Sequence, residues 1–461
     1  MKNKSKGKAV ERIYALLDEG SFVEIGQAVT ARSTDFQLEK IETPSDGVIT
    51  GYGLINGYPV YIYSQDAEVL GGSIGEMHAR KIVNLYDLAM KTGVAIIGMI
   101  DCAGIRLQES TDALHAFGMI YKKQAQVSGV ILQISAIFGN CGGGLSVFPT
   151  LTDFTLMEEN GQLFVNAPNA IDGNRKEVLN SASAKFQSSE AGTIDFVGKE
   201  DEILAEIKKL TGLFPSNYKD QSKRKECQDD LNRLCGNLDT LDAKEILTQI
   251  ADQNEFIELK KDYGSDMSIG FIRLDGETVG CIANQEERIS AQGAKKAAAF
   301  VKLCDAFGVG ILTITDVIGY VTAMEQEKEL AQAIGTMTGA FVQASVPKVN
   351  VITKKAFGSA YVSMNSKAVG ADLVYAFKDA KIGMMEAGMA AKIMNPTADA
   401  DVLKEKAQEY EKLQSDVNAA ARRGYVDTII DPQDTRKYVI GAFEMLYTKR
   451  ELKITKKHSA F

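Results

Sequence analysis

Hydrophobic residues along the chain follow two spacings, one typical of helices and one typical of strands. Residues 8–20 carry apolar side chains at helical spacing, which predicts a helix. Two apolar runs, 47–55 and 58–66, flank the Asn56-Gly57 pair and predict a β-hairpin. The pattern then predicts a helix at about 74–92 that ends at Gly93, a strand at 94–101, a helix near 112–128 and a strand at 129–138. Hairpin strands followed by strand–helix alternation predict a mixed α/β fold with parallel strand segments.

The second half of the chain repeats this pattern. It predicts hairpin strands on either side of Gly276, a helix at about 292–307, strands at 308–316 and from 348, and two final helices around a short strand. A shift of 215 positions superimposes Ala79 on Ala294, Lys81 on Lys296, Leu88 on Leu303, Gly93 on Gly308, Val94 on Val309, Ile96 on Ile311, Asp101 on Asp316 and Gly104 on Gly319. Because solenoid repeats span only about 20–50 residues, this period indicates a duplicated domain.

Chain length and composition fit two large domains. The 461 residues allow two to four domains, and the duplication favours two, at 1–214 and 242–461. The segment 215–241 between them is polar, highly charged and begins at Pro215, so it is the expected linker. Hydrophobic residues make up 45% and charged residues 25%, as in ordinary globular proteins.

Charge, cysteine and histidine content exclude several function classes. The net charge of −9 offers no basic face for nucleic acid. Six cysteines lack metal-ligand spacing and only three histidines occur, so we expect no metal site and buried free thiols. The basic, polar N-terminus has no apolar signal region, and no apolar run approaches the ~18 residues of a membrane span. We therefore expect a cytoplasmic protein.

The best candidates for chemistry are two small-residue turns that the duplication places in register. Gly139–Gly144 and Gly358–Ala360 each follow an apolar strand and precede the start of a helix. Successive small residues there allow backbone N–H groups to point at a developing negative charge, such as a thioester enolate. Glycines at such a junction also occur merely to permit a tight turn. Two turns in register favour the functional interpretation.

Other motifs are weaker. Ser73, in the sequence Gly-Gly-Ser-Ile-Gly, fits the pattern of a hydrolase nucleophile elbow but lacks a preceding strand and a suitably placed histidine. The glycine turns lack the Gly-Lys-Ser/Thr ending of a phosphate loop. The stretch 386–394 only superficially resembles a biotin attachment site and is interpreted as a helix packing face.

Three charged residues follow the predicted strand at 94–101. Asp101, Arg106 and Glu109 cluster in the turn there. They either form a structural ion-pair network, or Arg106 orients the loop or meets a phosphate of a ligand.

Taken in order, several long segments resemble the signature segments of the carboxyltransferase subunits of biotin-dependent acyl-CoA enzymes. This family includes the β subunits of propionyl-CoA carboxylases and the α subunits of methylmalonyl-CoA and glutaconyl-CoA decarboxylases. The similarity runs through essentially the whole chain. The segments are GGSIGEMHARKIVNLYDLA, DCAGIRLQES, SGVILQISAIFGNCGGGLSVFPTLTDF, GFIRLDGETVGCIANQ, VPKVNVITKKAFGSAY and ARRGYVDTIIDPQDTRKYV.

The resemblance implies two duplicated crotonase-like (β-β-α superhelix) α/β domains. The N-terminal domain would bind acyl-CoA and the C-terminal domain biotin, with each active site formed between the two halves of different subunits in a hexamer. Carboxybiotin would release carbon dioxide while its ureido nitrogen takes the α proton of the thioester. Carried over by motif, Gly143 and Gly144 would hold the thioester enolate, and Ser359 and Ala360 the biotin enolate. The remaining expected cofactor-binding residues are Gly142, Arg106, Gly358 and Tyr361.

The chain departs from the family pattern near both turns. Val362 stands where the family usually has an acid, and Ile318-Gly319-Tyr320 where it has Pro-Gly-Phe. Ala103-Gly104-Ile105-Arg106 replaces Gly-Gly-Ala-Arg, and Asp195 replaces a common histidine. These changes predict a divergent branch with an altered acyl pocket.

The leading functional hypothesis is a carboxyltransferase subunit that moves a carboxyl group between carboxybiotin and a short-chain acyl-CoA. No biotinyl lysine or ATP-binding fold is visible, so the expected partners are a biotin carboxyl carrier protein and a biotin carboxylase subunit. The alternatives are the α subunit of a sodium-pumping decarboxylase with a membrane decarboxylase subunit, a catalytically lapsed acyl-CoA-binding module, and a thioester hydrolase. Sequence alone leaves the acyl group and the reaction direction open.

Overall fold

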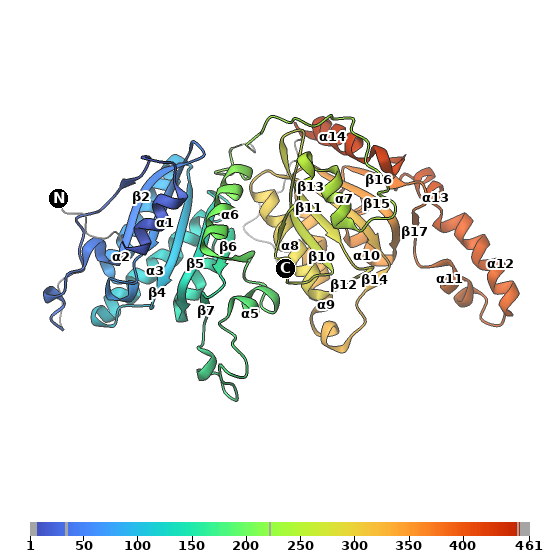
Figure 1. Ribbon diagram of the computed structural model, residues 1–461. Coiled ribbons are helices and arrows are strands. Elements are labelled where there is room, and N and C mark those ends of the chain that lie inside the picture. The colour runs from blue at the N-terminus through green and yellow to red at the C-terminus, as the bar shows by residue number, and fades with distance from the viewer. Residues whose placement is uncertain (1–6, 33–35, 221–222, 450, 452–461) are drawn as a thin grey trace. The chain divides into compact units, whose positions relative to one another are not determined.

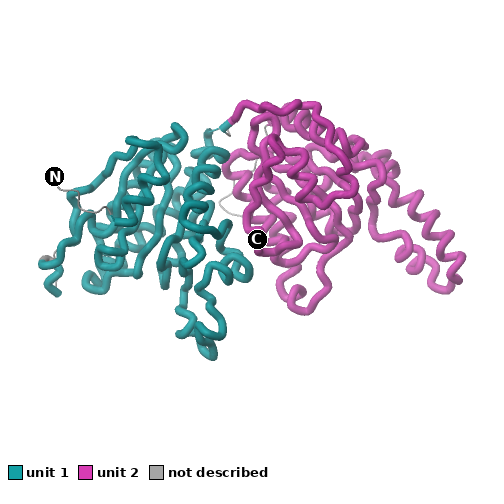
Figure 2. Tube along the Cα trace, viewed as in Figure 1, with its two compact units in different colours: residues 1–223 teal, residues 224–461 magenta. Residues whose placement is uncertain are grey.

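The computed structural model describes residues 7–32, 36–220, 223–449 and 451. The chain divides into two compact units at Lys223/Arg224, inside the expected linker (Figures 1 and 2). Residues after the division pack on the second unit: the Lys225 N–H donates to the Gly276 carbonyl at 3.1 Å, and the Cys235 N–H to the Gln433 carbonyl at 2.9 Å. Much of the expected linker is therefore part of the second unit's surface.

The first unit consists of one mixed sheet with helices packed on it (Figure 1). Its helices are α1 (Lys8–Leu16), α2 (Glu76–Thr92), α3 (Ser110–Val127), α4 (Val147–Thr150), α5 (Ala184–Ser189) and α6 (Glu200–Leu213). Its strands are β1 (Val23–Glu24), β2 (Val48–Ile55), β3 (Tyr58–Gln65), β4 (Ala95–Cys102), β5 (Gln133–Gly142), β6 (Phe154–Glu158), β7 (Gln162–Phe164) and β8 (Phe196–Gly198).

The second unit repeats this architecture and adds a helical extension, residues 384–415. Its strands are β9 (Ile257–Leu259), β10 (Met267–Leu274), β11 (Glu277–Asn284), β12 (Arg288–Ile289), β13 (Gly310–Val317), β14 (Gly319–Tyr320), β15 (Lys348–Phe357), β16 (Leu373–Phe377), β17 (Lys381–Gly383) and β18 (Thr428–Ile430). Its helices are α7 (Ala243–Ile250), α8 (Ala291–Ala306), α9 (Met324–Gln343), α10 (Gly358–Ser363), α11 (Ala387–Met394), α12 (Ala400–Tyr410), α13 (Val417–Arg422) and α14 (Thr435–Leu446).

Sheet topology confirms the duplication strand by strand. The first sheet has the order β1-β2-β3-β4-β5-β6-β8, with β7 added on β5. The second has the order β9-β10-β11-β13-β15-β16-β18, with β17 added on β15. Even an irregularity is repeated, because the β4–β5 register slips between Ile100 and Cys102 and the β13–β15 register slips between Thr315 and Val317. The mixed α/β, crotonase-like fold expected from the sequence is therefore confirmed.

The central parallel strands form the core of each unit. All positions of β4 except Asp101 are buried, since helices cover the sheet and a continuous apolar run suits such a strand. Helix α2 lays Ile82, Leu85 and Ala89 on this sheet, and burial of each large apolar side chain stabilises the fold by about 1.5–3 kcal/mol. The predicted helix end at Gly93 is confirmed by its left-handed φ of 68°.

Two predicted boundaries are wrong for identifiable reasons. The first helix ends at Leu16 rather than at residue 20, because the Asp18 carboxylate accepts the N–H groups of Asn56 and Gly57 and so ties the chain to the hairpin turn. Strand β5 continues to Gly142, whereas the sequence suggested a turn from residue 139, because residues 140–142 pair with β7.

Two further findings concern membrane-spanning helices and the cysteines. Within the part of the chain that is described, no helix is long and apolar enough to cross a membrane. All six cysteines are free thiols, five of them buried and Cys227 half-buried.

Candidate functional site

The candidate site starts from two equivalent turns at the carboxyl ends of β5 and β15. Gly143 begins a single 3-10 turn, Gly143–Ser146, and Gly358 begins helix α10. Their φ values are 63° and 64°, in the left-handed region that favours glycine. The duplicated fold thus reproduces the same backbone conformation at both positions.

Both turns have open space beside their first glycine. The first N–H groups of a helical turn have no acceptor within that turn. A Cβ added to Gly143 would meet no atom within 4 Å, and one added to Gly358 would meet only the Met384 carbonyl oxygen, at 3.3 Å. The next residue is exposed in each case, Gly144 in the first turn and Ser359 in the second. This arrangement suits the stabilisation of an oxyanion by backbone donors.

The duplication also relates the predicted donors to one another. The 215-residue shift places Gly143 on Gly358, Gly144 on Ser359 and Leu145 on Ala360. The predicted pairs, Gly143/Gly144 and Ser359/Ala360, are therefore offset by one residue. The position common to both pairs is Gly144 and its equivalent Ser359.

Two hydroxyl groups hold the first turn. The Tyr121 hydroxyl, from α3, donates to the Gly144 carbonyl, and the Ser146 hydroxyl donates to the Gly143 carbonyl at 2.7 Å. The Tyr121 ring packs edge-on against Phe117 and Phe148. Partial burial raises the pKa of Tyr121, so its phenol remains a proton donor at neutral pH. Sequence reasoning missed Tyr121, because α3 approaches the turn only in the folded unit.

A different set of hydroxyls holds the second turn. Ser363, the last residue of α10, is 4% exposed. The Thr338 hydroxyl, from α9, donates to its Oγ at 3.0 Å, and the Tyr320 hydroxyl, from β14, lies 3.1 Å from the same atom. Sequence reasoning singled out Tyr320 only as a departure from the family pattern and missed the other two.

Two other predicted site residues have packing roles beside the turns. A Cβ on Gly142 would come within 2.5 Å of the Phe164 ring, so glycine there allows β7 to pair closely with β5. The Tyr361 ring packs against the core cluster around Ile352 and Val374, and burial raises its pKa to about 12.

Arg106 is buried and its donors are occupied. It is 1% exposed, and its guanidinium contacts Asp46 Oδ1 at 2.6 Å, Glu109 Oε1 at 2.8 Å and the Ser73 carbonyl at 2.7 Å. The two carboxylates in turn accept the N–H groups of His78 and Glu76, at the start of α2. Of the three roles considered for Arg106, this geometry favours a structural ion-pair network and an orienting role in the loop over contact with a ligand phosphate.

Asp101 does not join this network. Its carboxylate instead pairs with Arg12 Nη1 at 3.6 Å, and Arg12 also contacts Glu200 at 3.2 Å and stacks on Phe138. The three charged residues therefore belong to two separate ion-pair networks, one around Arg106 and one around Arg12, because Asp101 is on β4 and faces α1.

The serine motif does not form a nucleophile elbow. Ser73 follows a 3-10 turn rather than a strand, and its Oγ accepts from Arg106 Nε at 3.4 Å. The nearby His78 directs its ring nitrogens to the Asp46 carbonyl and to Gln65, and burial lowers its pKa to about 3. The geometry agrees with setting the hydrolase interpretation aside.

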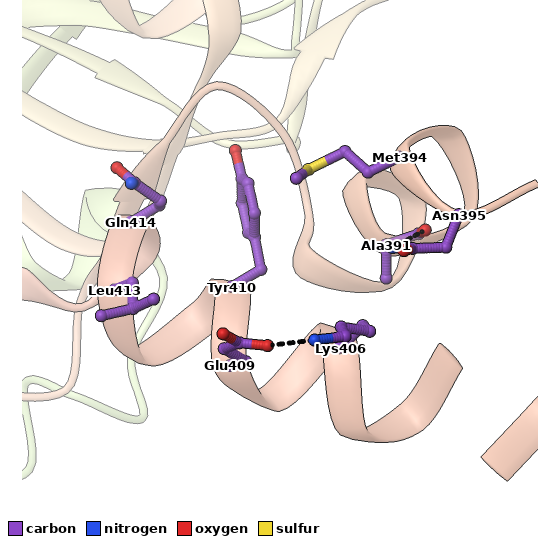
Figure 3. A pocket seen from close by; sticks show the side chains of 8 residues that line it. All are labelled: Ala391, Met394, Asn395, Lys406, Glu409, Tyr410, Leu413 and Gln414. Carbon is purple, nitrogen blue, oxygen red and sulfur yellow. Dashed lines mark hydrogen bonds and ion pairs between the residues drawn. The ribbon is translucent and has the colours of Figure 1, made fainter. Parts of the chain in front are cut away.

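A separate groove of about 340 Å³ lies in the helical extension of the second unit (Figure 3). The stretch 387–394 is indeed a packing helix, α11, with Ala390 and Ala391 buried. The groove is lined by Ala391, Met394, Asn395, Lys406, Glu409, Tyr410, Leu413 and Gln414. Its charged side chains, Lys406 and Glu409, pair with each other, so it offers no free charge for a charged ligand.

Metal chemistry finds no support in the residues that the structure describes. Among them, no group of three or more His, Cys, Asp or Glu side chains gathers as a metal site would require. One of the three histidines, His458, lies outside the described residues.

Comparison with known proteins gives matches over the full chain. The family model for the carboxyl transferase domain matches residues 2–461. Methylmalonyl-CoA decarboxylase subunit alpha of Propionigenium modestum is 37% identical over 99% of this chain and 94% of that protein. Propionyl-CoA carboxylase beta chain of Roseobacter denitrificans is also 37% identical, over 99% of this chain and 93% of its own length.

The fold matches a solved carboxyltransferase structure closely. The crystal structure of transcarboxylase 12S, described as a hexamer with hydrolysed methylmalonyl-coenzyme A bound, superimposes with a TM-score of 0.94 at 33% identity. The match covers 98% of this chain and 92% of that one.

Proposed function

The chain belongs to the carboxyl transferase domain family, and from that membership we propose that it moves a carboxyl group between biotin on a separate carrier protein and a short-chain acyl-CoA. The observation that carries this proposal is the pair of equivalent turns at Gly143 and Gly358, each with a left-handed glycine and open space beside it. Carboxyl transfer develops negative charge on two oxygens, so it calls for two such turns.

The first turn would serve the thioester. When the α proton leaves an acyl-CoA, charge moves onto the thioester oxygen, and the N–H groups of Gly143 and Gly144 would hold that oxygen in place. Preorganised donors of this kind contribute about 3–4 kcal/mol each in enzymes where one has been removed. Backbone donors can hold this oxygen without a cationic side chain, and the Arg106 guanidinium is already paired with Asp46 and Glu109.

The second turn would serve biotin, which supplies the carboxyl carrier and the base for the α proton. Residues at this turn fit an uncharged ureido group, since Ser359 and Ala360 offer backbone N–H groups and the space over Gly358 is open up to the Met384 carbonyl. Gly142 and Tyr361 would support the two turns by packing, and Gly358 by allowing the left-handed backbone.

Relatives acting in both directions are equally similar to this chain. A decarboxylase alpha subunit and a carboxylase beta chain each share 37% identity with it. Sequence identity therefore does not assign a direction, and a carboxylase and a decarboxylase role remain the two forms of one proposal. The partners follow from this choice: a biotin carrier in either case, with a biotin carboxylase in the first and a membrane decarboxylase subunit in the second.

We further propose that the chain assembles with copies of itself into a hexamer, in which the first unit of one subunit faces the second unit of another. The similar transcarboxylase 12S is described as a hexamer. In this chain, the helical extension exposes several large apolar side chains, and exposed apolar surface often marks a site of protein–protein contact. They are Met384, Met389, Ile393, Met394 and Leu413. Sedimentation analysis would test the assembly.

The deciding experiment is decarboxylation of malonyl-, methylmalonyl- and glutaconyl-CoA by the purified chain, with and without free biotin. Biotin-dependent loss of the carboxyl group from one thioester is the expected result, and it would identify the acyl group. Turnover without biotin would indicate a thioester hydrolase or another activity instead. Tight thioester binding with no turnover, in a folded oligomer supplied with a biotinylated carrier, would indicate a lapsed binding module.

A further inference from the structure

The two equivalent turns share a backbone conformation but not the side chains that hold it. Tyr320, Thr338 and Ser363 meet at the second turn through their hydroxyl groups. The residues 215 positions earlier are Ile105, Lys123 and Phe148, none of which has a hydroxyl group. Strand pairing supports the equivalence of Tyr320 and Ile105, since Ile289 pairs with Tyr320 as Ile74 pairs with Ile105.

At the second turn, one buried atom joins three elements. Ser363 Oγ receives the Thr338 hydroxyl from α9 and meets the Tyr320 hydroxyl from β14. Each hydroxyl has one proton to donate, so with Thr338 donating to Ser363, the Ser363 proton is available to Tyr320. Helix α10 has only six residues. Fixing its last residue therefore constrains the direction of the whole helix, including the N–H groups of Ser359 and Ala360 at its start.

At the first turn, the restraints act on the peptide groups themselves. In a planar trans peptide, the C=O and the following N–H point in opposite directions. Ser146 holds the Gly143 carbonyl and thus the plane that carries the Gly144 N–H. Tyr121 holds the Gly144 carbonyl and so fixes the next plane. Phe148 fills the place that Ser363 occupies in the second unit, and its ring packs on Phe117 with centroids 4.9 Å apart.

We propose that the two turns are positioned independently, the first by the Tyr121 and Ser146 hydroxyl groups and the second by the Tyr320–Ser363–Thr338 hydroxyl cluster. These are positioning residues, because they act through the backbone donors. The inference rests on the proposed function, in which the first turn serves the thioester and the second serves biotin. It follows that removing a single hydroxyl group weakens the interaction with one substrate and spares the other.

The test compares Tyr121→Phe with Tyr320→Phe, each of which removes one oxygen atom and keeps the ring. Thioester affinity is measured by calorimetry without biotin, and the KM for free biotin is measured from initial rates at saturating thioester. A typical net hydrogen bond corresponds to about a fivefold change in an equilibrium constant. We expect Tyr320→Phe to raise the KM for biotin about fivefold and to change thioester affinity by less than about twofold. We expect Tyr121→Phe to weaken thioester binding about fivefold and to change the KM for biotin by less than about twofold.

A second pair of variants separates positioning from stability. Thr338→Val removes the donor to Ser363, while Thr336→Val removes a hydroxyl on the same helix that bonds only to the Gln332 carbonyl. Only Thr338→Val should change the KM for biotin, although both lower the melting temperature to a similar extent.

Three outcomes would overturn the inference. If both parameters move together in either tyrosine variant, the turns are coupled rather than independent. If neither parameter moves in any variant, the hydroxyl groups have no positioning role. A wild-type chain that binds thioester but shows no biotin-dependent turnover refutes the proposed function itself, before any variant is compared, and the inference fails with it.

Discussion

Replacing Gly143 with alanine adds one methyl group at the centre of the first candidate turn. The new Cβ would meet no protein atom within 4 Å, so no neighbour has to move. The cost to folding comes from the backbone, because φ is 63° and a side chain in the left-handed region costs about 1 kcal/mol. For a unit of this size, that change lowers the melting temperature by about 2–4 °C.

Gly308→Ala provides the matched control. Gly308 has a φ of 71° and likewise no atom within 4 Å of an added Cβ. It precedes β13, at the amino-terminal edge of the second sheet, whereas both candidate turns follow the carboxyl ends of strands. The two variants should therefore lose similar stability but differ in activity.

The activity assay is biotin-dependent decarboxylation of the preferred thioester. In Gly143→Ala the methyl group occupies the open space in front of the backbone donors, and loss of one oxyanion donor costs about 3 kcal/mol, or about a hundredfold in kcat. Gly308→Ala should retain activity to within about twofold. If Gly143→Ala keeps activity comparable to that of Gly308→Ala while thioester still binds, the first turn is not the oxyanion site.

Three further predictions concern buried charges and the serine motif. Burial raises the pKa of Asp153 to about 7, so its ionisation destabilises the fold as pH rises from about 4 to 7. Asp153→Asn should therefore raise the free energy of unfolding by about 4 kcal/mol at pH 8 and leave it unchanged below pH 4, as followed by denaturant titration at several pH values. Asp372 precedes β16 as Asp153 precedes β6, and it accepts the Lys348 N–H as Asp153 accepts the Gln133 N–H. Because Asp372 pairs with Lys449 at 2.9 Å, Asp372→Asn should destabilise the fold at pH 8, and equal effects of the two variants would contradict the assignment. Arg106→Met leaves two buried carboxylates without their cation and should lower the free energy of unfolding by about 3–5 kcal/mol in the same titration. A loss confined to CoA affinity would instead support the phosphate-binding role. Ser73→Ala should keep most of the turnover in the decarboxylation assay, and complete loss in a folded protein would reopen the nucleophile interpretation.

Local patterns were enough to predict the two hairpins, the main helices and central strands of each half, the duplication and the two turns. Helical and strand spacings report which faces are buried, and the 215-residue shift appears in the residues themselves. Gly143 and Gly358 stood out because glycine marks backbone conformations that other residues avoid, and both adopt a left-handed φ. The donors proposed from the sequence lie at these turns, although assignment of their ligands stays a prediction.

The partners of the charged and hydroxyl side chains were decided only by the tertiary structure. Arg106 pairs with Asp46, 60 positions away, instead of with Asp101, and Tyr320 reaches Ser363 across 43 positions. Such contacts depend on which strands lie side by side and on how each helix crosses the sheet. The exact end of a strand also depends on its neighbours. Strand β5 continues to Gly142 because β7 pairs with it, and the turn therefore begins at Gly143. Sequence by itself determined where the chain can turn, because that is a local property of the backbone. The fold determined what holds each turn, because that depends on side chains brought together from distant segments.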